Sequence, residues 1–162
     1  MSVTDELLAN NAHYAETFTG PLPLPPSKQL AVVACMDARL NVYEALGLQE
    51  GEAHVIRNAG GVVTADTLRS LAISQRLLGT EEIILIHHTD CGMLTFTDDG
   101  FKDTVHKDTG LRPPWAAEAF DDLDADVAQS IARIKADAFV VHKDSIRGFV
   151  FDVATGRLTE VR

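Results

Sequence analysis

Short apolar runs alternate with longer segments of helical pattern from residue 30 onward, and this alternation limits the possible folds more than any other feature. Residues 30–34 and 83–86 are continuously apolar, as strands buried on both faces of a parallel sheet are. Residues 54–56 and 139–141 form two shorter runs of the same kind. Strands that alternate with helices indicate parallel βαβ units. We therefore expect a single-domain α/β fold with a central, mainly parallel β-sheet covered by helices.

Helical patterns separate these predicted strands. Apolar residues recur at helical spacing in 64–78 and in 116–136, and 42–48 is a shorter candidate helix. The end of the chain differs, because residues 149–153 and 157–161 have strand character and flank a turn that contains glycine. This pattern predicts a C-terminal antiparallel hairpin or edge strand.

The first 26 residues are organised differently from the rest of the chain. Residues 4–18 have a helical pattern, with Thr4 as the predicted N-cap and an incomplete apolar stripe. The proline-rich residues 20–26 cannot continue a helix and favour extended polyproline geometry. We expect residues 1–26 to form an N-terminal helical arm and linker, which either docks on a partner subunit or folds back. Residues 27–162 would then form the α/β domain.

Charge and hydropathy exclude several classes of function. The 162 residues carry 14 Lys and Arg against 24 Asp and Glu, a formal net charge of −10, which disfavours nucleic acid as a partner. No apolar run approaches the roughly 18–20 residues that span a bilayer, and the acidic N-terminus is unlike a signal peptide. We expect a cytoplasmic protein. In a reducing compartment its two cysteines would be metal ligands, nucleophiles or core residues rather than a disulfide.

Thiol, imidazole and charged side chains follow two of the predicted strands, where open α/β sheets bind their ligands. Cys35, Asp37 and Arg39 alternate after residues 30–34 and would share one face of an extended chain. His88 and Cys91 lie three positions apart after residues 83–86. Two cysteines and one histidine can form a zinc site with three protein ligands and an open fourth position. The guanidinium of Arg39 can hold the Asp37 carboxylate by paired hydrogen bonds.

Each of these residues also has a plainer interpretation. A single buried cysteine is usually a small hydrophobic residue, a neighbouring Asp and Arg often form a surface ion pair, and His88 could be a satisfied core histidine. His87 competes with His88 as a ligand, but the two point to opposite faces of a strand, so only one can face Cys91. The combination favours a metal site, because the only two cysteines both fall at strand ends beside other polar residues.

These motifs carry a family resemblance. Cys35-x-Asp37-x-Arg39, followed by His88-x-x-Cys91-Gly92, resembles the paired zinc motifs of the beta-class carbonic anhydrases. The intervening Arg57-Asn58-Ala59-Gly60-Gly61 resembles the segment that follows the second strand in that family. The resemblance extends from about residue 29 to residue 93, and the short chain is similar to the small prokaryotic, actinobacterial-like branch.

The resemblance implies a function and a set of site residues. Cys35, His88 and Cys91 would bind one Zn²⁺ per chain, and the reaction would be the reversible hydration of carbon dioxide to bicarbonate and a proton. In the family, zinc-bound hydroxide is the nucleophile, oriented by the residues that match Asp37 and Arg39. In some relatives the matching aspartate becomes the fourth zinc ligand at low pH, which gives the hypothesis of a closed form here.

The resemblance also concerns the substrate cleft and the assembly. Gly60 and Gly61 would help to shape the substrate-binding cleft, because glycine lets backbone approach closely. Family members form dimers or multiples of dimers. The resemblance therefore implies a homodimer or a dimer-based tetramer, with the helical arm crossing the interface.

Two other functions remain open from the sequence. A carbon disulfide or carbonyl sulfide hydrolase on the same scaffold would share Cys35, His88 and Cys91. A non-catalytic zinc-binding module or redox sensor is the alternative from a different class. The Asp37–Arg39 pair argues against that module, because a structural zinc usually has a fourth protein ligand.

Overall fold

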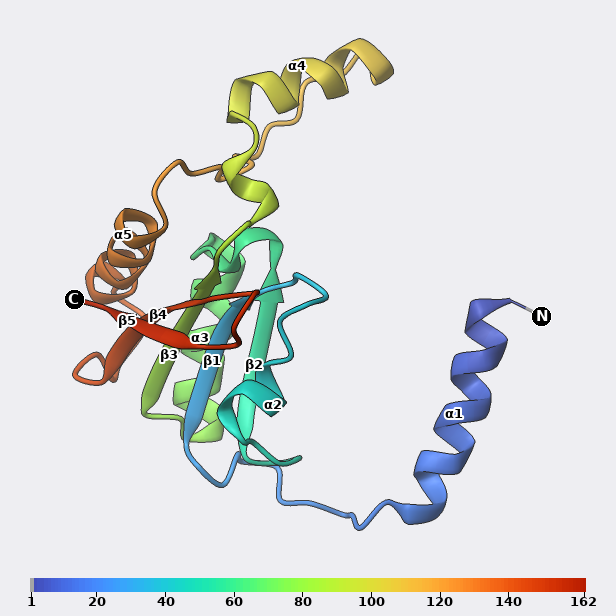
Figure 1. Ribbon diagram of the computed structural model, residues 1–162. Helices are drawn as coiled ribbons and strands as arrows, with labels where there is room; N and C mark the ends of the chain where they lie inside the picture. Colours follow the sequence, from blue (N-terminus) through green and yellow to red (C-terminus); the bar gives the residue numbers. More distant parts are fainter. Residues whose placement is uncertain (1) are drawn as a thin grey trace.

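Five strands form one sheet in the order β2-β1-β3-β4-β5 in the computed structural model, which describes residues 2–162 (Figure 1). The β1–β2, β1–β3 and β3–β4 pairs are parallel, and β4–β5 is antiparallel. The predicted α/β fold with a mainly parallel sheet and an antiparallel C-terminal pair is therefore confirmed. The strands are β1 (Leu30–Cys35), β2 (Ala53–Asn58), β3 (Glu82–His88), β4 (Ile146–Phe151) and β5 (Leu158–Val161).

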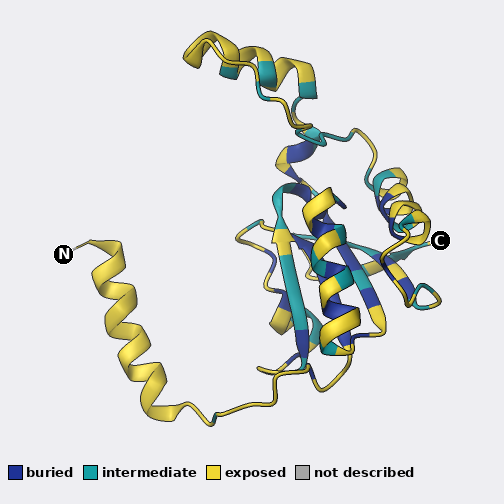
Figure 2. Ribbon diagram, turned by 180° about the vertical axis from the view of Figure 1, so that it is seen from behind, coloured by how far each residue is buried: buried dark blue, intermediate teal, exposed yellow. Residues whose placement is uncertain are grey.

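The sheet has an apolar core on each face because β1 and β3 bury both of their sides. Every residue of β1 is buried, as its unbroken apolar sequence predicts. On one face, alternate residues of β1 pack with α3 (Ala65–Leu78) and α5 (Leu123–Ala136). On the other face they pack with α2 (Val42–Leu46) and the segments around the strand ends. Figure 2 shows the buried residues concentrated in the strands.

Capping residues set the ends of α3. The side chain of Thr64 accepts a hydrogen bond from the amide of Thr67 at the first turn. Gly79 has φ +70° and donates its amide to the carbonyls of Gln75 and Ser74 at the last turn. The predicted helix 64–78 is confirmed with its glycine stop. It packs on the sheet and fixes the chain between β2 and β3.

The N-terminal helix α1 (Val3–Thr17) stands away from the sheet in both ribbon views (Figures 1 and 2). Its N-cap is Ser2 rather than Thr4, because Ser2 and Asp5 exchange side chain to backbone hydrogen bonds in a capping box. No residue of α1 is buried. None of the helices within residues 2–162 is both long and apolar enough to cross a bilayer.

The predicted strand at residues 139–141 is wrong, and the fourth strand is β4. The side chain of Gln75 accepts hydrogen bonds from the amides of Val141 and His142 and donates one to the carbonyl of His142. A buried side chain therefore satisfies the main-chain groups that a neighbouring strand would otherwise pair.

One helix boundary and one whole helix between β3 and β4 also differ from the sequence-based expectation. The helical pattern of 116–136 becomes helix only from residue 123, where the side chain of Asp122 caps α5. Helix α4 (Asp98–Thr109) was missed because none of its residues is buried, so it lacks a clear apolar stripe. It extends away from the sheet (Figure 1).

Candidate metal centre

The three predicted ligands meet at one edge of the sheet. Cys35 ends β1, His88 ends β3, and Cys91 follows His88 just before the 3₁₀ turn η2 (Gly92–Leu94). β1 and β3 are parallel neighbours, so their carboxyl ends lie at the same edge. One ligand atom from each of the three side chains lies within 4.8 Å of the other two. Their exposed fractions are 4, 0 and 3 %, so water is largely excluded from these groups.

The hydrogen bonding of His88 leaves a nitrogen free for a metal. Its Nδ1 lies 2.9 Å from the carbonyl oxygen of Thr89, so Nδ1 carries the proton and donates it. Nε2 therefore holds a lone pair, and it is buried without a hydrogen-bond partner in the described part of the chain. A buried, unpaired imidazole nitrogen next to two thiols suits a divalent ion that prefers nitrogen and sulfur ligands. The residues present therefore fit zinc.

Without a metal, the three ligand groups shift one another's pKa values. A hydrogen bond from the Cys91 thiol lowers the pKa of Cys35 well below its ordinary value, against the opposing effect of burial. The same contact with Cys35, together with burial, raises the pKa of Cys91. The proximity of the Cys35 sulfur raises the pKa of His88. A bound cation would replace the protons on these groups, so metal affinity should rise with pH.

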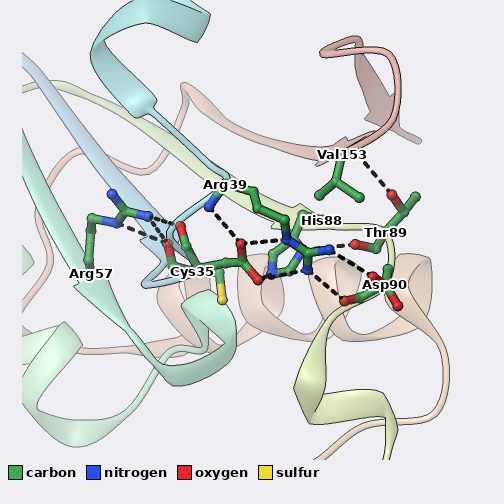
Figure 3. Close-up of polar contacts among 8 residues, drawn as sticks. Cys35, Arg39, Arg57, His88, Thr89, Asp90 and Val153 are labelled. Carbon is green, nitrogen blue, oxygen red and sulfur yellow. Dashed lines mark hydrogen bonds and ion pairs between the residues drawn. The ribbon is translucent and has the colours of Figure 1, made fainter.

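The predicted Asp37–Arg39 pair lies beside His88, and Figure 3 shows Arg39 together with Cys35 and His88. Asp37 Oδ1 accepts from the backbone amide of Arg39 at 2.8 Å and from its Nε at 2.9 Å, and Oδ2 accepts from Nη2 at 2.8 Å. These bonds hold the pKa of Asp37 far below its usual range. Oδ2 lies 3.7 Å from Nε2 of His88. The pair forms in a turn rather than along an extended strand, because β1 ends at Cys35.

Asp90 is a partner of this pair that the sequence did not single out. Arg39 Nη1 donates to Asp90 Oδ2 at 2.7 Å, and Nη2 donates to the Asp90 carbonyl at 3.0 Å. Asp90 has φ +55°, within the motif that carries His88 and Cys91. The guanidinium of Arg39 thus connects the two ligand segments, and only its placement between them reveals this role.

The two predicted glycines lie in the 3₁₀ turn η1 (Ala59–Gly61), which follows β2. Gly60 has φ +85°, and its backbone amide is one of the groups that lower the pKa of Cys35. Gly61 has φ +68°, and a Cβ there would lie 2.7 Å from the Cys35 nitrogen and 3.0 Å from the Ile86 carbonyl oxygen. Glycine is therefore required at position 61 by both its dihedral angle and the neighbouring backbone.

Comparisons with known proteins agree with this geometry. Residues 30–143 match the family model described as carbonic anhydrase. Beta-carbonic anhydrase 1 of Mycobacterium tuberculosis is 66% identical over 161 residues, which cover 99% of each chain. The chain belongs to the beta class of carbonic anhydrases.

A solved structure and a second type of enzyme are also similar to this beta-carbonic anhydrase. The crystal structure of carbonic anhydrase from Streptococcus mutans superposes with a TM-score of 0.93 at 43% identity, covering 100% of this chain and 99% of that one. A carbon disulfide hydrolase from Acidithiobacillus thiooxidans is 33% identical over 156 residues, which cover 83% of this chain and 78% of that protein. The scaffold is therefore shared with an enzyme named for a different substrate.

His87 faces away from the cluster of Cys35, His88 and Cys91 in this carbonic anhydrase. Its ring is fully buried, and Nε2 lies 2.6 Å from Oδ2 of Asp126 in α5. The ring also lies 5.3 Å from that of Phe120, between centroids. His88, and not His87, lies with the two cysteines, as the alternation of side chains along a strand predicts.

An apolar cavity of about 510 Å³ lies near the candidate ligands, since Met93 in its wall belongs to the same buried cluster as Cys35 and Cys91. Ala59, next to Gly60, and Met93, close to Cys91, contribute to its wall. The single tryptophan, Trp115, also lines the cavity, together with Phe101 of α4. Apolar side chains make up most of the lining, and the larger ones are Ile56, Val62, Met93, Phe96, Phe101 and Trp115.

Proposed function

We propose that this beta-carbonic anhydrase hydrates carbon dioxide reversibly with one Zn²⁺ per chain, held by Cys35, His88 and Cys91. The observation that carries this proposal is a cluster of three buried ligands with an Asp–Arg pair, rather than a fourth ligand, beside it. Two thiolates offset the charge of the dication, and His88 adds none. When bound, zinc acts as a Lewis acid that lowers the pKa of a coordinated water to about 7.

Asp37 orients the nucleophile in this proposal. Its pKa is lowered by Arg39, so at neutral pH the carboxylate is ionised and can only accept hydrogen bonds. It would accept the O–H of the attacking oxygen and leave a lone pair of that oxygen facing the substrate carbon. Arg39 holds both carboxylate oxygens, and Asp90 holds Arg39. The positions of these side chains are therefore fixed before substrate arrives, which reduces the entropic cost of reaction.

The surroundings suit a small, uncharged substrate. Gly60 and Gly61 present backbone without side chains next to the ligands, and we assign them to the wall of the substrate cleft. The apolar cavity offers carbon dioxide a weakly hydrated approach from the side of Met93.

Asp37 is also our candidate for a fourth ligand in a closed form at low pH. Its Oδ2 lies 3.7 Å from Nε2 of His88, so a small movement would bring it among the ligand atoms. Such a movement requires Asp37 to leave Arg39. A series of crystal structures across pH that always retained the Asp37–Arg39 pair would contradict this form.

The decisive experiment measures carbon dioxide hydration by stopped flow, with the zinc content of the same samples, for the unmodified enzyme and Asp37→Asn. We expect the variant to retain zinc and to lose activity by roughly 100-fold, because the nucleophile is no longer oriented. Asp99→Asn is the matched control, since Asp99 lies on α4 and pairs with Arg112 far from the ligands. Wild-type activity in Asp37→Asn would refute the orienting role.

The same samples separate the alternative functions. Stoichiometric zinc with hydrolysis of carbon disulfide or carbonyl sulfide, and no hydration of carbon dioxide, would favour the sulfur-substrate relative on the same scaffold. Stoichiometric zinc without either activity would favour a non-catalytic zinc module or redox sensor.

We propose that the enzyme is a homodimer or a dimer-based tetramer in which α1 crosses between subunits. Leu7, Leu8, Tyr14 and Phe18 of this arm are exposed. Contiguous exposed apolar side chains commonly mark an interaction site. We also place the enzyme in the cytoplasm, where reducing conditions keep Cys35 and Cys91 available as metal ligands.

A further inference from the structure

The guanidinium of Arg57 lies against the main chain of the first ligand segment (Figure 3). Its Nε and Nη2 donate to the carbonyl oxygen of Cys35 at 2.9 and 2.7 Å. Nη2 also donates to the carbonyl oxygen of Asp37 at 2.8 Å. One side chain therefore holds the backbone on both sides of Met36.

These hydrogen bonds occur where the pairing of β1 with its neighbouring strands ends. Strand β1 ends at Cys35, and its pairing with β3 extends only to Ala34. Beyond that point, the Met36 amide donates to the Asn58 carbonyl at 2.8 Å. The side chain of Arg57, from the end of β2, then adds three hydrogen bonds to the same short segment. Carbonyls beyond the sheet would otherwise depend on water or local turns.

The held segment contains two functional side chains. Cys35 supplies a ligand sulfur, and Asp37 supplies the carboxylate that pairs with Arg39. The backbone positions of these two residues decide where the sulfur and the carboxylate lie relative to each other. The guanidinium of Arg57 donates to main-chain carbonyls, so it acts on the site through the backbone.

We propose that Arg57 is a positioning residue that fixes the Cys35 ligand and the Asp37 carboxylate relative to each other. The part that concerns Asp37 rests on the function proposed above, whereas the part that concerns Cys35 requires only a metal site. The two arginines act on different parts of Asp37, because Arg39 holds its side chain and Arg57 holds its main chain.

The next residue of β2, Asn58, stabilises the glycine turn that follows this strand. Asn58 Nδ2 donates to the carbonyl of Val62 at 2.9 Å and to Oγ1 of Thr67 at 3.2 Å. Asn58 thereby fastens the turn that contains Gly60. The end of β2 thus anchors both the first ligand segment and the glycine turn that packs against it.

The chemistry requires arginine at position 57. A guanidinium is planar, and its Nε and Nη2 donors point in fixed directions toward two acceptors. A lysine ammonium is a single flexible donor group, so it can satisfy a carbonyl without fixing the segment. Arg57→Lys should therefore restore only part of the function that Arg57→Ala loses.

The test compares the zinc affinity of metal-stripped enzyme by chelator competition for wild type, Arg57→Ala and Arg57→Lys. The absorption spectrum of cobalt-loaded protein reports the geometry of the thiolate ligands in the same variants. Arg69→Ala is the matched control, because Arg69 is exposed on α3 and pairs only locally with Asp66. Unfolding by denaturant measures the stability of each protein.

We expect Arg57→Ala to bind zinc about 10–100-fold more weakly, as loss of groups that orient metal ligands does. Its cobalt spectrum should change and its kcat for carbon dioxide hydration should fall. Arg57→Lys should lie between wild type and Arg57→Ala, and Arg69→Ala should match wild type.

Equal zinc affinity and equal cobalt spectra in Arg57→Ala and Arg69→Ala would overturn the proposal. Reduced stability with unchanged affinity, spectrum and kcat would also overturn it, because it would show a purely structural role. If Arg57→Ala does not fold, wild-type affinity and spectrum in Arg57→Lys would overturn the proposal instead. A wild-type enzyme inactive on carbon dioxide would contradict the proposed function, while the affinity and spectral comparison would still test Arg57.

Discussion

Replacement of Gly61 by alanine tests whether close backbone packing supports the metal centre. The φ of +68° costs an L-residue about 1–2 kcal/mol. The new Cβ would also lie 2.7 Å from the Cys35 nitrogen and 2.9 Å from the Ala34 carbonyl carbon. These are backbone atoms of a buried strand that cannot rotate away, so crowding should add about 1–3 kcal/mol. We expect Gly61→Ala to lower the free energy of unfolding by about 2–5 kcal/mol and to weaken zinc binding.

Gly79→Ala separates the two contributions. Gly79 has φ +70°, and nothing lies within 4 Å of a Cβ added there, so this variant reports the dihedral cost alone. The lower entropy of the unfolded chain with alanine is common to both variants and cancels in their comparison. Denaturant unfolding of metal-stripped protein at one fixed concentration avoids contributions from metal binding and assembly. Stabilities of the two variants within about 0.5 kcal/mol of each other would refute the crowding argument, given the expected crowding cost.

Three further predictions concern segments outside the site. The Asp98 carboxylate accepts hydrogen bonds from the amides of residues 117–119, and these bonds lower the pKa of Asp98. The ionised carboxylate therefore contributes fully to stability above about pH 4, and this contribution is lost as the pH falls further. Asp98→Asn should reduce the hydrogen-exchange protection of those amides at pH 7, and a difference that did not shrink below about pH 4 would contradict the charge argument. Gln75→Leu would leave main-chain groups of residues 141–142 unpaired and should lower the free energy of unfolding by about 2–5 kcal/mol in denaturant unfolding. A loss under about 1 kcal/mol would show that water replaces the side-chain amide of Gln75. Deletion of residues 1–26 should lower the number of subunits per particle that light scattering measures, and an unchanged number would exclude the arm from the interface.

The sequence was sufficient, for a local reason, to predict three of the parallel strands and the grouping of Cys35, His88 and Cys91. The unbroken apolar run of β1 and that of β3 each require burial on both faces, which only a covered parallel sheet provides. Cys35 follows one run and His88 and Cys91 follow the other, so adjacent parallel strands bring them together. Alternation along β3 also selected His88 over His87. The apolar periodicity did not predict helix α4, because this helix has no buried face and therefore no regular apolar stripe.

Only the tertiary structure decided which groups hold the ligands in place. Arg39 meets Asp90 across 51 positions, Arg57 meets Cys35 across 22, and His87 meets Asp126 across 39. Such pairs depend on how strand ends and loops are placed relative to one another. Local sequence patterns encode which face of an element is buried, but they do not encode which distant donor reaches a given carbonyl or carboxylate. The sequence by itself therefore determined most of the sheet and the three residues that meet at its edge, whereas the packing of the chain determined their supporting hydrogen bonds.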